Sequence, residues 1–237
     1  MPNVYSGTSG WAYSSWKPDF YPASLASARF LGYYATRLNS VEVNYAFRSF
    51  PTDRLLKGWT DATPAKFKFA VKAHQSITHV KRLRGAAELT AQFISSLQPL
   101  EKAGRLGPVL FQLPPFLKCD VPMLTEFLAT LPPHLRAAFE FRNVSWFADE
   151  VFAALRKRNV ALCHAESEKI QTPTVQTADF FYLRLRKDTY SAKSLGEQTQ
   201  RIADLSRRAE VFAYFKHEET PEGALRAEAL LAAINAR

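Results

Sequence analysis

Short runs of β-branched and aromatic residues recur along the chain and alternate with segments whose apolar residues stand three and four positions apart. The short runs predict eight strands, and the longer periodicity predicts helices between most of them. The predicted strands are residues 4–9, 40–44, 67–72, 108–113, 137–142, 160–166, 180–185 and 211–216. The clearest predicted helices are residues 24–38, 87–104, 146–159 and 222–236.

The spacing of these elements favours one closed barrel over an open sheet. Eight strands in 237 residues give about 30 residues per unit, which is typical of a βαβ repeat. No Gly-x-Gly-x-x-Gly fingerprint follows the first strand, and an open doubly wound sheet usually has fewer strands. We therefore predict an α/β fold, a single (β/α)8 TIM-barrel-like domain over residues 1–237. Only residues 167–179 join strands six and seven, so we expect the sixth helix to be reduced.

Composition narrows the class of protein further. The chain is 47% hydrophobic and 13% aromatic, which suits a packed core rather than a disordered chain. Its two cysteines, Cys119 and Cys163, cannot form a disulfide framework, and no Cys/His cluster predicts structural zinc. Neither a secretory signal nor an apolar run of about 20 residues is visible. We expect a cytoplasmic protein that makes no membrane contact.

Charge is unevenly distributed and suggests a kind of partner. The formal net charge is +9, and residues 62–87 contain six lysines and arginines but no acidic residue. Such a segment suits an anionic partner, either a phosphate-bearing small molecule or nucleic acid. The alternative is a basic solvated face that only aids solubility.

Polar side chains recur where the predicted strands end. The residues concerned are Glu42, Asn44, Lys72, Gln112, Glu140, Arg142, His164, Glu166, Arg184, Arg186, Lys216 and His217. In an extended chain alternate side chains share a face, so Glu140 and Arg142 point one way while Phe139 and Phe141 point the other. Barrel enzymes place their active sites at the carboxyl ends of the strands. We therefore expect these polar residues to form a ring around one site.

Roles follow from side-chain chemistry. Glu140, Glu42, Glu166 and Lys72 are the candidate catalytic residues. The candidate substrate-binding residues are Arg142, Arg184, Gln112, Asn44, Trp11, His79 and Lys216. The alternative is a structural network in which the three glutamates neutralise Lys72, Arg142 and Arg184.

Two further features of the ring have alternative interpretations. The aromatic residues of the loop at 10–22, Trp11 among them, could stack on bases or sugars, although packing as a lid is favoured. We predict no cofactor and no metal site. A divalent metal held by Glu42, Glu140 and Glu166 with His164 or His217 is the less favoured alternative.

The same motifs carry a family resemblance. They are GTSGW (7–11), FYP (20–22), VEVN (41–44), FAVKA (69–73), ITH (77–79), GPVLFQLPP (107–115), FEFRNVSW (139–146), ALC (161–163), TADFFYLRL (177–185) and YFKHE (214–218). In collinear order they resemble the YecE-like family, domain of unknown function 72, over nearly the whole chain. The resemblance implies a TIM-barrel-like fold and no particular activity. Asn143 and Arg186 stand where the family often has histidine, and Glu166 stands where aspartate is common, so a step that needs either histidine is not implied here.

Three hypotheses about function follow. The favoured one is a hydrolase acting on an anionic, phosphate-bearing substrate, with nucleic acid as one such class, Glu140 as acid/base and Arg142, Arg184 and Lys72 stabilising negative charge. A sugar-phosphate lyase or isomerase with Lys72 or Lys216 as an amine is the first alternative. A non-catalytic nucleic-acid-binding or scaffold protein is the second.

Overall fold

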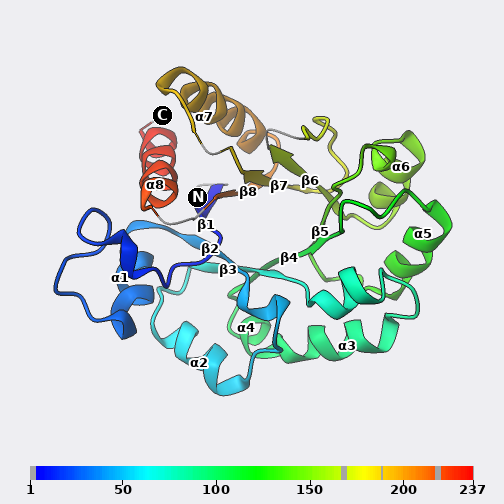
Figure 1. Cartoon of the computed structure of the whole chain (residues 1–237), viewed down its shortest axis with the longest axis horizontal. Helices are drawn as coiled ribbons and strands as arrows, with labels where there is room; N and C mark the ends of the chain where they lie inside the picture. Colours follow the sequence, from blue (N-terminus) through cyan, green and yellow to red (C-terminus); the bar gives the residue numbers. More distant parts are fainter. Residues whose placement is uncertain (1–3, 167–169, 188, 217–219, 237) are drawn as a thin grey trace.

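Eight parallel strands form a nearly closed barrel in the computed structural model, which describes residues 4–166, 170–187, 189–216 and 220–236 (Figure 1). Hydrogen bonds join the strands in the order β1-β8-β7-β6-β5-β4-β3-β2. The strands are β1 (Val4–Thr8), β2 (Ser40–Val43), β3 (Lys68–Lys72), β4 (Leu106–Gln112), β5 (Ala137–Glu140), β6 (Ala161–Glu166), β7 (Phe180–Leu185) and β8 (Glu210–Phe215). The predicted TIM-barrel-like fold is confirmed.

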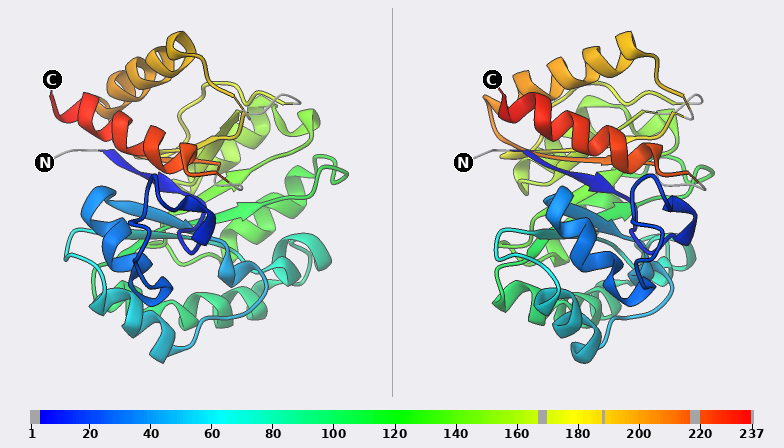
Figure 2. Two further views of the ribbon diagram at one scale, coloured as in Figure 1. Left: turned by 60° about the vertical axis from the view of Figure 1, so that its left-hand side comes forward. Right: turned by 90° about the vertical axis from the view of Figure 1, so that its left-hand side faces the viewer.

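Helices surround the strands on the outside of the barrel (Figures 1 and 2). They are α1 (Phe30–Arg37), α2 (Asp53–Asp61), α3 (Ala87–Ser96), α4 (Gln98–Lys102), α5 (Val121–Thr130), α6 (Asp149–Lys157), α7 (Ala192–Ser206) and α8 (Glu222–Asn235). Side-chain oxygens cap several of them, as when Thr52 accepts from the Leu55 amide and Asp120 from the Met123 amide. None of these helices is long and apolar enough to cross a membrane within the part of the chain that is described.

The helical periodicity located helices correctly but not where they break. The segment 87–104 divides into α3 and α4, because Pro99 lacks the amide that would continue α3 and instead sits in the first turn of α4. The segment 24–38 becomes a short 3-10 turn (Ser27–Arg29) followed by α1. Between β6 and β7, residues 170–179 contain no helix, in line with the expected reduction of that crossover.

Side chains of unequal size fill the barrel interior. Small residues occupy the inward positions of β3, β5 and β6, and aromatic residues occupy those of β7 and β8. The interior residues are Tyr5, Ala70, Leu110, Ala138, Ala161, Cys163, Ala165, Ala178, Phe180, Tyr182, Phe212 and Tyr214. The large rings of β7 and β8 therefore take up the space that the small residues of β3, β5 and β6 leave.

Side chains rather than a regular ladder close the barrel between β1 and β2. The Asn39 amide accepts from the Ser6 amide at 2.8 Å and donates to the Val4 carbonyl at 2.9 Å. The Tyr34 hydroxyl accepts from the Thr8 amide at 2.8 Å and donates to the Ser40 carbonyl at 3.0 Å. These groups satisfy backbone polar atoms that would otherwise be buried and unpaired at the seam.

Candidate functional site

One guanidinium lies at the centre of the polar residues at the carboxyl ends of the strands. Arg184 on β7 reaches across the barrel, where its Nη2 donates to Glu42 Oε1 on β2 at 2.7 Å and its Nη1 donates to Glu140 Oε2 on β5. The side chains of all three residues are at most 5% exposed. Burial lowers the pKa of Arg184, but the two carboxylates outweigh it and leave that pKa raised. Arg184 is therefore a permanently charged link between opposite walls.

Each carboxylate has further donors. Glu42 also accepts from Ser9 Oγ at 2.6 Å, Tyr182 OH at 2.8 Å and Arg186 Nη2 at 3.1 Å. Both oxygens of Glu42 are therefore occupied, which satisfies a carboxylate that is fully buried. The candidates from sequence did not include Ser9 or Tyr182, and Arg186 was expected in the ring but was given no catalytic or binding role. Their positions in phase with interior residues of β1 and β7 are the signal that could have identified them.

Glu140 accepts from two cations of different exposure. Its Oε1 lies 3.2 Å from Arg142 Nε, while its Oε2 accepts from Arg184. The Arg142 side chain is 47% exposed, so its guanidinium borders the open end of the barrel. Gln112, which is opposite Glu140 in the β4–β5 register, has its Oε1 only 3.5 Å from Arg184 Nη1, a weak contact.

Lys72 at the end of β3 differs from the three arginines of this group, because it has no acidic partner among the described residues. Its Nζ lies 4.0 Å from the centre of the Phe47 ring, and among the described residues no carboxylate oxygen is within 4.0 Å of it. Burial, together with the positive charge of Arg184, lowers the pKa of Lys72 to about 8, although Glu42 and Glu140 oppose the shift. The amine therefore changes protonation near neutral pH, which an ordinary lysine does not do.

His79 and Asn44 lie at the edge of this group. The His79 ring packs edge-on against Phe47 with ring centres 5.1 Å apart. Burial and the neighbouring cations Lys72 and Arg142 lower the pKa of His79, so its imidazole is neutral at pH 7. Asn44 Nδ2 donates to the Ser9 carbonyl at 3.4 Å, and Asn44 Oδ1 is buried without a partner among the described residues.

The charges of this cluster do not balance. We define the strand-end cluster as Ser9, Glu42, Lys72, Gln112, Glu140, Arg142, Tyr182, Arg184 and Arg186. It contains four basic side chains and two carboxylates, a surplus of two positive charges. The Nε atoms of Arg184 and Arg186 are also buried without a hydrogen-bond partner in the described part of the chain. The cluster therefore has charge and donor capacity for an anion.

The expectation for β6 was wrong. The interior positions of that strand are Ala161, Cys163 and Ala165, so His164 and Glu166 face outward. Glu166 Oε1 lies 2.5 Å from Lys187 Nζ, and Tyr190 OH donates to Glu166 Oε2 at 3.3 Å. The irregular segment at 170–177 covers the outside of β6 in place of a helix. Its backbone needs polar partners, and this is why polar residues face outward there.

Trp11 also lies apart from the contacts described above. The Trp11 indole packs edge-on against Trp59 of α2 at 5.4 Å, and Trp59 in turn stacks on the outer face of β3. Three of the aromatic residues in the loop at 10–22, Trp16, Phe20 and Tyr21, are buried in the core, in line with the packing interpretation. Lys216 directly follows β8, where its backbone amide donates to the Leu185 carbonyl at 3.0 Å.

The alternative set of metal ligands is not assembled. Glu42 and Glu140 bind arginines, while Glu166 and His164 face outward, and His217 lies outside the described residues. No group of three or more His, Cys, Asp or Glu side chains is placed to hold a metal ion within the described ranges.

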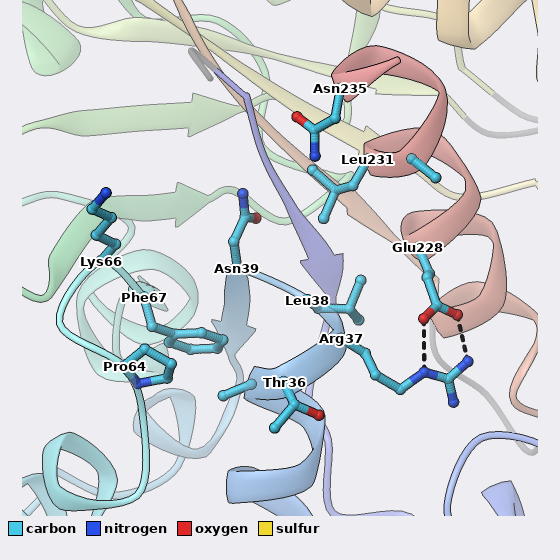
Figure 3. Close-up of a pocket in the computed structure, with 12 residues that line it drawn as sticks. Thr36, Arg37, Leu38, Asn39, Pro64, Lys66, Phe67, Glu228, Leu231 and Asn235 are labelled. Carbon is cyan, nitrogen blue, oxygen red and sulfur yellow. Dashed lines mark hydrogen bonds and ion pairs between the residues drawn. The ribbon is translucent and has the colours of Figure 1, made fainter. Parts of the chain in front are cut away.

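A pocket of about 390 Å³ lies at the opposite end of the barrel (Figure 3). Asn39 and Phe67, which precede β2 and β3, line it together with Asn235 at the end of α8. Its arginine, Arg37, donates from Nε to Glu228 Oε1 at 2.8 Å and from Nη1 to the Phe20 carbonyl at 2.7 Å. Both ends of the Asn39 side-chain amide are already hydrogen-bonded to the backbone of β1. This pocket therefore offers fewer groups for chemistry than the strand-end cluster does.

Comparisons with known proteins agree with the fold. The family model described as "Protein of unknown function DUF72" matches residues 5–237. The chain is similar to UPF0759 protein YunF of Bacillus subtilis (30% identical over 151 residues, 61% of this chain and 52% of that protein). It is similar to UPF0759 protein YecE of Escherichia coli K12 at 30% over 146 residues, 61% of this chain and 50% of that protein. The matched segments span about half the length of these relatives.

A solved structure covers more of the chain. The crystal structure of a DUF72 family protein from Thermotoga maritima superposes with a TM-score of 0.87 at 26% identity, over 98% of this chain and 99% of that chain. The barrel architecture is therefore shared from end to end.

Proposed function

The chain belongs to the DUF72 family, and we propose that it is an enzyme that binds a phosphate-bearing substrate at the carboxyl ends of its strands and hydrolyses it. The observation that carries the proposal is the surplus of positive charge in the strand-end cluster. Arginine and lysine side chains that border a partly buried site are the groups that proteins use to bind phosphate.

The residues of the cluster divide into two roles. Among the described residues, the only carboxylate that Arg142 contacts is that of Glu140, the only one that Arg186 contacts is that of Glu42, and the Arg186 Nε has no hydrogen-bond partner. They are the proposed anion-binding groups, together with Lys72, which lies near Arg142. Arg184 is the proposed positioning residue, since it holds together the two glutamates that orient the outer arginines.

Lys72 is the proposed proton donor. A group with a pKa of about 8 is mostly protonated at pH 7 and close enough to neutrality to donate a proton to a leaving oxygen. Glu140 is less suited to this role than we expected, because guanidinium groups occupy both of its oxygens. We assign Glu140 and Glu42 to the positioning of the arginines.

The low pKa of Lys72 favours a second candidate function. A lysine amine that is partly deprotonated at neutral pH can attack a carbonyl carbon and form an imine. A lyase or isomerase of sugar phosphates would use the arginines for the phosphate and Lys72 for the carbonyl. Sodium borohydride reduction in the presence of dihydroxyacetone phosphate distinguishes the two candidates. A stable mass adduct on Lys72 would favour the lyase or isomerase and count against hydrolysis.

The test of the proposal is binding followed by turnover. Isothermal titration should detect inorganic phosphate binding to the full chain, and a panel of phosphate mono- and diesters should include a substrate that is hydrolysed. Lys72→Met and Arg142→Gln should each weaken phosphate binding. The matched controls are Lys57→Met, on the exposed face of α2, and Arg207→Gln, directly after α7, and neither should weaken it. Phosphate binding that is equal in all four variants would refute the proposal, and binding without any turnover would favour a scaffold protein.

A further inference from the structure

The exposed large apolar side chains of the described residues are not scattered over the surface. They are Tyr45, Val80, Phe116 and Val144, at 51%, 69%, 63% and 69% exposure. Each of them lies in the connection that follows one of the strands β2, β3, β4 and β5. All four therefore lie on one half of the rim around the strand-end cluster. We call the loops at 44–52, 73–86, 113–120 and 141–148 the half-rim.

Contacts between neighbouring loops make the half-rim continuous. Phe47 of the first loop packs against His79 of the second at 5.1 Å. The Arg82 guanidinium of the second loop lies 5.1 Å from the centre of the Phe116 ring on the third. Asn143 Nδ2 of the fourth loop donates to the Pro115 carbonyl of the third at 3.0 Å. The exposed side chains are thus displayed on one connected surface.

The charge of the half-rim is strongly biased. It contains six lysines and arginines, namely Arg48, Lys81, Arg82, Arg84, Lys118 and Arg142. Its single acidic residue is Asp120, which lies 2.5 Å from Arg84 Nη2 and caps α5. An exposed apolar surface with this charge fits a partner that is both anionic and aromatic.

The backbone presents Arg82 in a constrained way. Arg82 and Leu83 have φ angles of 51° and 71°, a left-handed conformation that residues with side chains rarely adopt. The Leu83 side chain is buried and its amide donates to the Ile77 carbonyl at 3.0 Å, and these contacts hold the turn. Arg82 is thereby directed over the Phe116 ring. Strained backbone of this kind is common where a side chain contacts a ligand.

We infer that the half-rim binds single-stranded nucleic acid. Bases would stack on the exposed rings of Tyr45 and Phe116, and Lys81 and Arg82 would contact the phosphates between them. A duplex hides the faces of its bases, so stacking on projecting rings favours a single strand. The inference rests on the proposed function in one respect: one phosphate of the strand is taken to enter the strand-end cluster beside Arg142.

Fluorescence anisotropy with a labelled single-stranded DNA 12-mer, its RNA equivalent and the matching duplex tests the inference. We expect the single strands to bind at 50 mM salt and the duplex to bind more weakly. Phe116→Ala and Tyr45→Ala should each weaken single-strand binding about 5- to 150-fold, the effect of losing one stacked base. Phe116→Tyr should retain binding, because a tyrosine ring stacks equally well.

Charge variants separate specific contacts from general attraction. Lys81→Ala and Arg82→Ala should each reduce the slope of log affinity against log salt by about 0.7, the value for one phosphate contact on a single strand. Arg84→Gln on the same loop should change it less, since Arg84 already pairs with Asp120. Equal effects of all three variants would indicate unspecific attraction and overturn the inference.

Titration of inorganic phosphate into the same variants keeps this inference distinct from the proposed function. Phosphate binding should survive Phe116→Ala and be weakened by Lys72→Met. If phosphate binds but no single strand does, the half-rim inference falls and the proposed function stands. If the strand binds but phosphate does not, the half-rim inference stands without its phosphate in the cluster, and the proposed function falls. A dimer that is lost in Phe116→Ala, without strand binding, would identify the half-rim as a contact between copies and overturn the inference.

Discussion

Replacing Glu140 by glutamine keeps the size of the side chain and removes its charge. In the native cluster both oxygens of Glu140 face guanidinium donors, from Arg142 at 3.2 Å and from Arg184. Glutamine would turn one of these acceptors into a donor, so that two donors face each other in a site that is almost fully buried. Neutralising one partner of a buried pair costs about 3–5 kcal/mol.

The neighbours of Glu140 place the expected loss near the lower end of that range. Arg184 keeps Glu42 at 2.7 Å, and the contact with the half-exposed Arg142 contributes little. We therefore expect Glu140→Gln to lose about 3 kcal/mol of unfolding free energy. For a domain of this size that loss lowers the melting temperature by about 6–12 °C. Chemical denaturation at pH 7 and calorimetry measure the two quantities.

Two comparisons make the test specific. Glu210→Gln breaks the ion pair with Arg136 at the other end of the barrel, where both side chains are about one-third exposed, and should lose less than about 1 kcal/mol. Adding Arg184→Met to Glu140→Gln should cost about 0.5–3 kcal/mol less than the sum of the two single changes, because the pair is coupled. If Glu140→Gln loses less than about 1 kcal/mol while activity disappears, the positioning role is wrong and Glu140 is catalytic after all.

Three other predictions concern separate parts of the molecule. Burial lowers the pKa of His164 to about 4, because it outweighs the hydrogen bond to the Val175 carbonyl and the Arg201 charge acts in the same direction. Between pH 6.5 and pH 4 the unfolded chain therefore binds a proton on this residue more readily than the folded chain does. Stability should fall by about 2 kcal/mol between pH 7 and pH 5 through this group, a loss that denaturation curves of His164→Gln should lack. Phosphate affinity should fall as pH rises through about 8 and Lys72 loses its proton, and titration of Lys72→Met should lack this step. Gly7→Ala would place a Cβ 1.9 Å from the Ser40 carbonyl oxygen at the β1–β2 seam, so its melting temperature should drop sharply, and an unchanged value would contradict the described seam.

The strand pattern predicted the barrel because each strand is a short β-rich run and every crossover except the one between β6 and β7 is long enough for a full helix. The same period of two placed Glu42, Glu140 and Arg184 on interior faces, and this is why their convergence could be anticipated. The sequence did not reveal that Arg184 is the partner shared by Glu42 and Glu140. That depends on reach across the barrel, since the Arg184 side chain on β7 is long enough to meet carboxylates on both β2 and β5.

The errors have local physical causes. Both faces of β6 are buried, so alternation could not tell the inward alanines from His164 and Glu166. Ser9 and Tyr182 went unrecognised because a hydroxyl next to core residues carries no charge signal in the sequence. Trp11 was placed near a substrate because aromatic loops can stack on ligands, whereas its ring packs on Trp59.

Crystallising the protein and locating a phosphate-like anion in it tests the central claim most directly. Tungstate has the shape and charge of phosphate and scatters anomalously, so a soaked crystal gives its position without reference to any assumed substrate. We predict an anomalous peak within hydrogen-bond distance of Arg142 or Arg186 and close to Lys72. A peak that is absent there, and present only at other basic groups such as Lys66 beside the pocket at the opposite end, would contradict the account.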